Sequence, residues 1–243
     1  SEKEGIEKVT PESAYKKYQD VLKNSQIEVF YVGAEPNPEL KEKIKSVFSY
    51  ERNVPVCNYR SFSPLKPEPE YVTERMKNVL QSKMVMVFKS ENTDFFAMYV
   101  LNAIFGGSTT SKLFSNVREK MSLCYYCAAS YNFINGLMIV DSGVLNENIE
   151  KTEKAILKEV EDMKNGNITD FEIEATKRAI VNGFRTSNDT TAGIDNWYSS
   201  QFINDGFNSI EELAAKYNAV TKEEIVEAAK KLTLDTVYVL KNK

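Results

Sequence analysis

The sequence contains no histidine among its 243 residues. Histidine is the most frequent general base and the most frequent zinc ligand in proteins. Its absence excludes Ser-His-Asp triads, Cys-His dyads and every metal motif that contains histidine. We therefore expect no catalytic residue, no metal ligand and no cofactor in this chain by itself.

Long apolar runs and a disulfide framework are also missing. No stretch approaches the roughly 18 to 20 consecutive apolar residues of a membrane span, and the N-terminus has no apolar signal-peptide core. Three cysteines suggest free thiols in a reducing compartment. A net charge of -4 with interleaved signs gives no basic face for nucleic acid. We expect a cytoplasmic protein without a membrane or nucleic-acid partner.

The length and the 42% hydrophobic content are sufficient for one large globular domain. The sequence starts at Ser1 rather than at methionine, so we expect it to begin inside a longer chain. Thr10 and Pro11 have the pattern of a helix start. We expect residues 1–25 to form a connector helix from a missing N-terminal half, and residues 26–243 to form a single α+β domain.

The hydrophobic pattern predicts strands mainly before residue 145 and helices after it. Asn135-Gly136 between two β-rich runs is a strong hairpin signal, and three capping boxes at Thr169, Ser209 and Thr221 mark helix starts. The order of elements predicts an α+β fold, a mostly antiparallel sheet with helices packed on one face. The predicted strands are residues 27–32, 71–76, 84–88, 123–134, 137–144 and 236–240, and the first helices of the domain are residues 37–48, 94–105 and 110–121.

Two short motifs resemble known sites without matching them. Cys124 and Cys127 have the C-x-x-C spacing, but they lie in a predicted strand, where residues three apart point to opposite faces. The run from Gly106 to Lys112 has Ser111 where a phosphate-binding loop has its second glycine, and it follows a helix. We interpret the cysteines as two small core residues and the run as a helix C-cap followed by an N-cap.

Arg118 and Tyr125 are the candidate binding residues. Arg118 stands near the end of a predicted helix, and Tyr125 follows seven residues later at the start of a strand. A guanidinium and a phenol at one rim offer donors for a peptide carbonyl or a developing oxyanion. Exposed arginines and strand tyrosines are common, so the residue types alone do not establish such a site.

The segment around these two residues resembles the C-terminal-half signature of pitrilysin, insulinase and mitochondrial-processing-peptidase-like zinc peptidases. The resemblance rests on residues 95–131, with Gly-Gly-Ser at 106–108, Ser-Lys-Leu-Phe-Ser-Asn-Val-Arg-Glu-Lys at 111–120 and Leu-Cys-Tyr-Tyr at 123–126. It implies a fold of two similar halves that close around an unfolded peptide. It also implies that zinc is bound by the other half, in cis or in a partner subunit, while Arg118 and Tyr125 bind the substrate.

The sequence leaves more than one function open. The first is the substrate-binding half of a zinc metalloendopeptidase, which needs a separate zinc-bearing half for hydrolysis. The alternative is a catalytically inactive homologue that serves as a scaffold or peptide-binding subunit. A third interpretation is an unrelated α+β binding domain.

Overall fold

The computed structural model describes residues 5–35, 37–49, 51–52, 61–90, 94–202 and 206–242. Their contacts divide the chain into two compact units. The first comprises residues 1–59 and 187–206, and the second comprises residues 60–186 and 207–243. The second unit contains the whole sheet and both candidate binding residues.

The sheet of the second unit has five strands in the order β1-β5-β2-β4-β3. Only β1 and β5 are parallel, and the other three neighbouring pairs are antiparallel. The fold class expected from the sequence, a mostly antiparallel α+β sheet, is therefore confirmed. The strands are β1 (Glu70–Met76), β2 (Ser82–Lys89), β3 (Cys124–Asn132), β4 (Leu137–Val144) and β5 (Thr233–Asn242).

The predicted hairpin joins β3 to β4, but its loop is longer than the Asn-Gly dipeptide. β3 already ends at Asn132, whose side-chain oxygen accepts hydrogen bonds from the backbone N–H groups of Ile134 (3.0 Å) and Asn135 (3.3 Å). Gly136 has a φ of 65°, in the left-handed region, and a Cβ there would lie 2.3 Å from the carbonyl oxygen of Ser90. Only glycine fits this position without strain.

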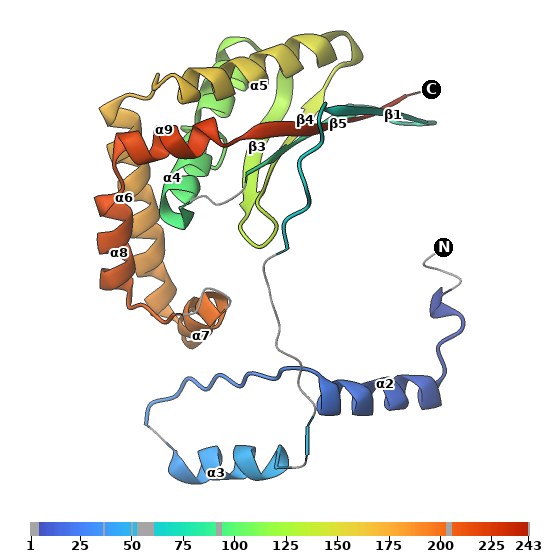
Figure 1. Cartoon of the computed structure of the whole chain (residues 1–243), viewed down its shortest axis with the longest axis vertical. Coiled ribbons are helices and arrows are strands. Elements are labelled where there is room, and N and C mark those ends of the chain that lie inside the picture. Colours follow the sequence, from blue (N-terminus) through green and yellow to red (C-terminus); the bar gives the residue numbers. More distant parts are fainter. Residues whose placement is uncertain are drawn as a thin grey trace. The chain divides into compact units, whose positions relative to one another are not determined.

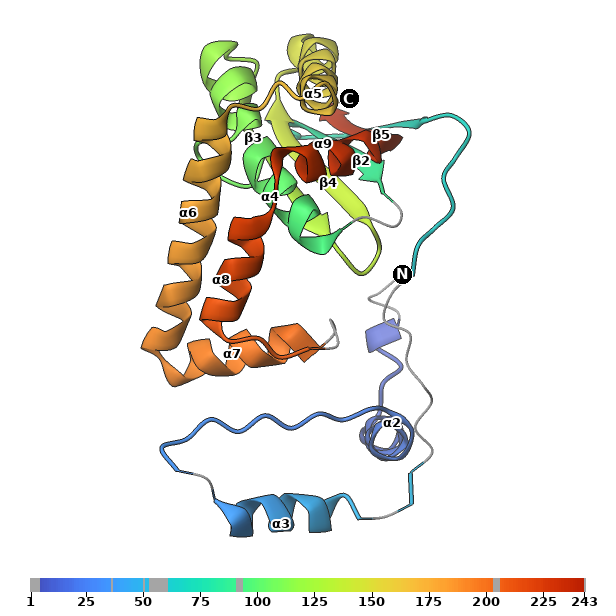
Figure 2. The same ribbon diagram turned by 60° about the vertical axis from the view of Figure 1, so that its left-hand side comes forward.

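Helices of the second unit cover one face of the sheet, as the two views in Figures 1 and 2 show for α4, α5 and α9. The helical segments are α4 (Phe95–Phe105), the π-helix η1 (Leu113–Lys120), the 3-10 turn η2 (Asn146–Asn148), α5 (Ile149–Lys164), α6 (Asp170–Thr186), α8 (Ile210–Ala219) and α9 (Lys222–Lys230). Within the described ranges, none of the helices has both the length and the apolar character of a membrane span.

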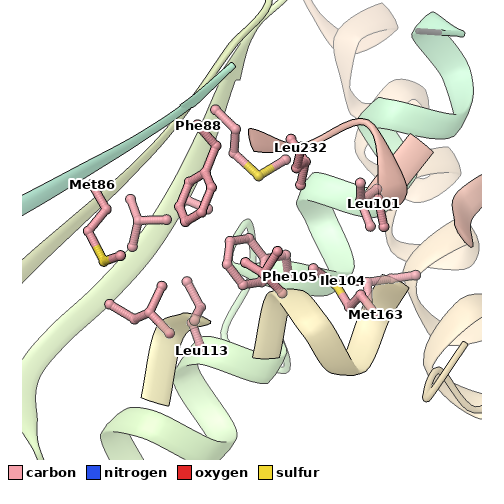
Figure 3. Close-up of a cluster of buried hydrophobic side chains, with 14 of the residues drawn as sticks. Met86, Phe88, Leu101, Ile104, Phe105, Leu113, Met163 and Leu232 are labelled. Carbon is pink, nitrogen blue, oxygen red and sulfur yellow. The ribbon is translucent and has the colours of Figure 1, made fainter. Parts of the chain in front are cut away.

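The core lies between the sheet and these helices. Along β2 the helix-facing side chains of Met84, Met86 and Phe88 are 0–1% exposed, whereas Val85 and Val87 on the other face are half-buried. Figure 3 shows side chains from β2, α4, η1 and α5 gathered in this cluster. Full burial of such a side chain contributes about 1.5–3 kcal/mol to folding. This alternation fixes which side of each strand faces the helices.

The three predicted capping boxes are confirmed. In each, the Ser or Thr oxygen accepts the N–H of the glutamate three residues later, at 3.2 Å, and that glutamate accepts the N–H of the cap, at 2.8 Å. These paired bonds satisfy N–H groups that have no partner inside a helix. Local sequence alone therefore sets where α6, α8 and α9 begin.

The first unit contains α2 (Pro11–Asn24), α3 (Pro38–Val47), the 3-10 turn η3 (Ser187–Asp189) and α7 (Thr191–Gln201). Thr10 caps α2 with Pro11 at its first position, as predicted. The prediction of a strand at residues 27–32 is wrong, because this segment has no regular secondary structure. A β-rich sequence becomes a strand only when a neighbouring strand takes up its backbone hydrogen bonds.

Candidate functional site

Arg118 is positioned by η1, which the sequence predicted only as a helix. Leu113 and Val117 are fully buried and anchor this π-helix in the core. The N–H of Met121 donates to the carbonyl of Asn116, five residues back, at 3.0 Å. Phe114 and Arg118 are four residues apart on one face of this helix, and the guanidinium carbon lies 4.6 Å from the ring centroid. π-helical segments are rare and are found frequently at functional sites.

Two hydrogen bonds hold the Arg118 guanidinium in place. Its Nε donates to the carbonyl oxygen of Tyr125 at 2.7 Å, and its Nη1 donates to Glu119 Oε1 at 2.8 Å. The Nη2 group has no hydrogen-bond partner among the residues that the structure describes. A guanidinium has five N–H donors, so Arg118 is fixed in orientation and still has donors to offer.

Tyr125 is at the same rim as Arg118, and its side chain is exposed. The residue is 59% accessible, and the described part of the chain provides no hydrogen-bond partner for its hydroxyl. The structure thus brings the two predicted residues together, although it links Arg118 to the backbone of Tyr125 and not to the phenol. Their role in binding stays a prediction.

Two open hollows meet at this pair. One of about 440 Å³ is bordered by Leu123, Cys124 and Leu145, and the other, of about 480 Å³, by the loop of residues 106–109 and the β3 segment of residues 126–128. Arg118 and Tyr125 line both of them. Because they border both hollows, Arg118 and Tyr125 together form the ridge between them.

β3 is an edge strand of the sheet, and its outer edge is partly occupied. The N–H of Ala129 donates to the carbonyl of Gly106 at 3.0 Å, and a Cβ on Gly106 would lie 2.5 Å from that nitrogen. Backbone groups alternate in direction along an antiparallel strand, so the N–H and C=O of Cys127 also point outward, toward the second hollow. The interpretation of Gly106 as a helix C-cap is confirmed, but sequence reasoning missed its docking on β3.

The cysteine pair corrects a prediction. Cys124 is opposite Val144, and Cys127 is opposite Ser142, because a β-bulge at Tyr125 inserts one extra residue into β3. Val144 and Ser142 are two apart on a regular strand and share a face, so the two cysteines also share a face. The expectation that they point to opposite faces is wrong. The Cys127 thiol lowers the pKa of the Cys124 thiol.

Polar contacts beneath the site tie η1 to the helices behind it. Lys112 pairs with Glu172 of α6 at 2.9 Å, and Asn116 donates to Glu159 of α5 at 2.9 Å. Glu159 is 7% exposed, and its burial raises the pKa of the carboxyl despite the Asn116 hydrogen bond, which lowers it. These contacts fix η1, and hence Arg118, from the side opposite the hollows.

The residues present do not fit a zinc site. The sequence has no histidine, and the described ranges hold no group of three or more cysteine, aspartate or glutamate side chains placed to bind a metal ion. A structural or catalytic zinc ion needs at least three protein ligands. The site can therefore donate hydrogen bonds and shape a binding surface, and no metal-dependent step is assigned to it.

The family model described as "Peptidase M16 inactive domain" matches residues 8–180, more than half of the chain. The chain belongs to this family. The resemblance to pitrilysin- and insulinase-type peptidases predicted from residues 95–131 is thereby confirmed. As expected for an M16 inactive domain, the fold class agrees with that of solved relatives.

Three comparisons place this M16 inactive domain among its relatives. It is 32% identical over 240 residues to the "Probable inactive metalloprotease YmfF" of Bacillus subtilis (strain 168), covering 97% of this chain and 56% of that protein. It is 25% identical over 174 residues to the "Uncharacterized zinc protease YmxG" of the same organism, covering 68% and 42%. A conserved protein from Enterococcus faecalis V583 superimposes with a TM-score of 0.87 at 31% identity, covering 98% and 57%. The chain thus spans about half the length of the relatives that it matches.

Proposed function

We propose that this chain is the non-catalytic half of an M16-type protein and that it holds an extended peptide without hydrolysing it. The observation that carries the proposal is the ridge of Arg118 and Tyr125 between two open hollows, in a chain that has no histidine. The ridge supplies hydrogen-bond donors and no group suited to activate water. The relative named a probable inactive metalloprotease supports binding over hydrolysis.

The chemistry of the ridge favours a peptide backbone as its ligand. The unused N–H groups of Arg118 and the hydroxyl of Tyr125 can donate to carbonyl oxygens. The outward N–H and C=O of Cys127 in the second hollow offer the pairing that an extended strand accepts. All of these groups bind the main chain, which is the same in every peptide. The proposed site therefore selects little for particular side chains.

The partner in this proposal is a second M16-type half, located in the same polypeptide or in another subunit. The chain spans 56% and 42% of two of its curated relatives, which leaves room for such a half in those proteins. Residues 1–25 are proposed to connect to it. The side chains of Tyr15, Tyr18 and Val21 on α2 are 39–62% exposed, and a facing half is proposed to cover this apolar stripe.

A second candidate is the substrate-binding half of an active zinc endopeptidase. The relative named an uncharacterized zinc protease favours it. Zinc would then be bound by the other half, and Arg118 and Tyr125 would hold the substrate beside it once the halves close. The two candidates differ in whether the complete protein cleaves the peptide that it binds.

The test uses the full-length parent protein and a fluorescein-labelled unstructured peptide. We expect binding, measured by fluorescence anisotropy, and no cleavage with or without a metal chelator. Arg118→Ala should weaken binding about tenfold, or about 1.4 kcal/mol, because it removes charged donors. Tyr125→Phe should cost less, since it removes one neutral hydroxyl. Lys120→Ala, which removes a cation from the same helix outside both hollows, is the control.

Each other outcome of this test would overturn a stated part of the proposal. Chelator-sensitive cleavage would establish the second candidate in place of the first. Binding that is unaffected by Arg118→Ala and Tyr125→Phe would remove both residues from the site. Absence of both binding and cleavage in a folded parent would overturn both candidates.

A further inference from the structure

Cys124 and Cys127 form a side-chain cluster for which the proposed function has no use. The bulge at Tyr125 turns both side chains to the same face of the sheet, where they are neighbours along β3. Both cysteines are in the free form. Two free cysteines that are neighbours on one face of a strand are candidates for a dithiol that is oxidised to a disulfide.

Each sulfur-bearing residue borders one of the two hollows. Cys124 is half-buried and lines the first, and Cys127 is 4% exposed and lines the second. A small oxidant can therefore reach Cys124 from solvent, whereas bulky reagents have little access to Cys127. The two thiols differ in accessibility as reactive dithiols do.

The surroundings of the two thiols shift their pKa values in opposite directions. The hydrogen bond from Cys127 lowers the pKa of Cys124, and the nearby Arg118 charge lowers it further, while burial opposes both. For Cys127, the hydrogen bond to Cys124, burial and the negative charge of Asp141 all raise the pKa. These opposite directions assign Cys124 as the nucleophile of the pair and Cys127 as the thiol that donates a proton.

We propose that Cys124 and Cys127 are a redox-active dithiol whose oxidising substrate is a hydroperoxide and whose product is an intrachain disulfide. The bulge, the shared face and the open hollow beside Cys124 carry this assignment. The proposal does not depend on peptide binding, and its test adds no peptide ligand. It can therefore fail or succeed separately from the proposed function.

The reaction balances with hydrogen peroxide as the oxidant. The Cys124 thiolate attacks one peroxide oxygen, the O–O bond breaks, and the leaving hydroxide takes up the proton that Cys124 had released. Cys124 is then a sulfenic acid. The Cys127 sulfur attacks the Cys124 sulfur, the S–O bond breaks, and the hydroxyl leaves as water with the Cys127 proton. Two thiols have given two electrons and two hydrogens, and one peroxide has become two waters.

The first experiment treats the unmodified protein with hydrogen peroxide, alkylates it under denaturing conditions and maps its tryptic peptides. Trypsin separates the third cysteine, in the peptide of residues 53–60, from the pair, which remains together in residues 121–151. We expect the peptide of residues 121–151 to lose two hydrogens and both alkylatable thiols, and dithiothreitol to restore them. Oxygen adducts on Cys124, or disulfide-linked dimers, without this internal link would overturn the proposal.

The second experiment assigns the two roles in the Cys57→Ser background. With Cys127→Ala added, oxidation should stop at a Cys124 sulfenic acid that dimedone traps. With Cys124→Ala added, Cys127 should react with iodoacetamide at least about tenfold more slowly than Cys124 does. Circular dichroism confirms that each variant is folded. Equal alkylation rates, or no dimedone adduct, would overturn the assignment of Cys124 as the nucleophile.

Discussion

Arg118 shows how a surface arginine becomes a defined binding group. Free arginine side chains lose rotamer entropy when they bind a ligand. Here the Phe114 ring, the Tyr125 carbonyl and Glu119 already fix the guanidinium. Part of the ordering cost is therefore met by folding, so ligand binding by the remaining N–H groups is less costly. This preorganisation is the physical basis for the effect expected of Arg118→Ala on peptide binding.

Ser122, between η1 and β3, provides a prediction about stability. Its φ of 51° lies in the left-handed region, which costs a non-glycine residue about 1 kcal/mol. Its hydroxyl makes only a long hydrogen bond of 3.3 Å to the carbonyl of Glu119. We expect Ser122→Gly to raise the free energy of unfolding by up to about 1 kcal/mol in urea titrations.

The matched control is Ser122→Ala, which keeps the backbone strain and loses the weak hydrogen bond. It should leave stability unchanged or lower it slightly. Glycine and alanine variants of equal stability would show that the left-handed conformation at Ser122 carries no cost in the folded protein.

At the scale of elements, β2 and β5 are joined by a buried ion pair. Lys89 Nζ lies 2.7 Å from Asp235 Oδ1, and the two side chains are 11% and 7% exposed. Lys89 also donates to the carbonyl of Pro64 at 2.9 Å, so the pair ties the segment before β1 to the sheet. Burial raises the pKa of Asp235, but the hydrogen bonds from Lys89 and Thr236 and the lysine charges outweigh it, and the net pKa is lowered.

We predict that Asp235→Asn lowers the free energy of unfolding by about 3 kcal/mol, because it leaves the Lys89 charge buried without a partner. Lys66→Ala should cost less than about 1 kcal/mol, since Lys66 is 39% exposed and lies at 3.5 Å from Asp235. Urea unfolding of the three proteins measures both. A loss for Asp235→Asn no larger than that for Lys66→Ala would show that the pair does not stabilise the sheet.

The pH dependence of this pair has a definite sign. The folded pKa of Asp235 is lower than the unfolded value, so its stabilisation is fully present above the unfolded pKa, at about 4. It is lost as the pH falls through the folded pKa. The unmodified protein should therefore lose stability in this acidic range more steeply than Asp235→Asn does.

At the scale of the whole molecule, burial is concentrated in the second unit. The helices α2 and α3 contain no buried residue, whereas β2 and α4 consist largely of buried ones. Amide exchange reports the free energy of local opening, which follows buried apolar contact. We predict fast hydrogen exchange in α2 and α3 and strong protection in β2, β4 and α4, measured by mass spectrometry on this chain alone. Equal protection of α2 and β2 would contradict this prediction.

The sequence predicted the local features well because each has a short-range cause. The capping boxes at Thr169, Ser209 and Thr221 need only a hydroxyl and a glutamate three residues apart. The helix ending at Gly106 and the hairpin near Gly136 follow from turn chemistry in the same way. The spacing of Arg118 and Tyr125 predicted that they lie at one rim, whereas their proposed binding role came from the family resemblance, since the residue types are too common to indicate it.

The predictions that were wrong concern features that depend on residues far apart in the sequence. Residues 27–32 have strand-forming side chains but form no strand, because strand formation depends on a partner that local sequence does not specify. Cys124 and Cys127 share a face because the pairing of β3 with β4 shifts by one residue at Tyr125. A bulge is a property of two strands together, so the spacing within one of them could not reveal it.

The sequence by itself determined the absence of histidine chemistry, the helix starts, the mostly antiparallel α+β class and membership in the family. Composition and capping boxes are visible directly in the chain, the fold class follows from the order of the predicted elements, and the family follows from the motif at residues 95–131. Only the tertiary structure decided that Arg118 holds the backbone of Tyr125, that Gly106 docks on β3 and that two cysteines share a face beside a hollow. These features arise from strand register and from the close approach of distant segments, which depend on the packing of the whole domain.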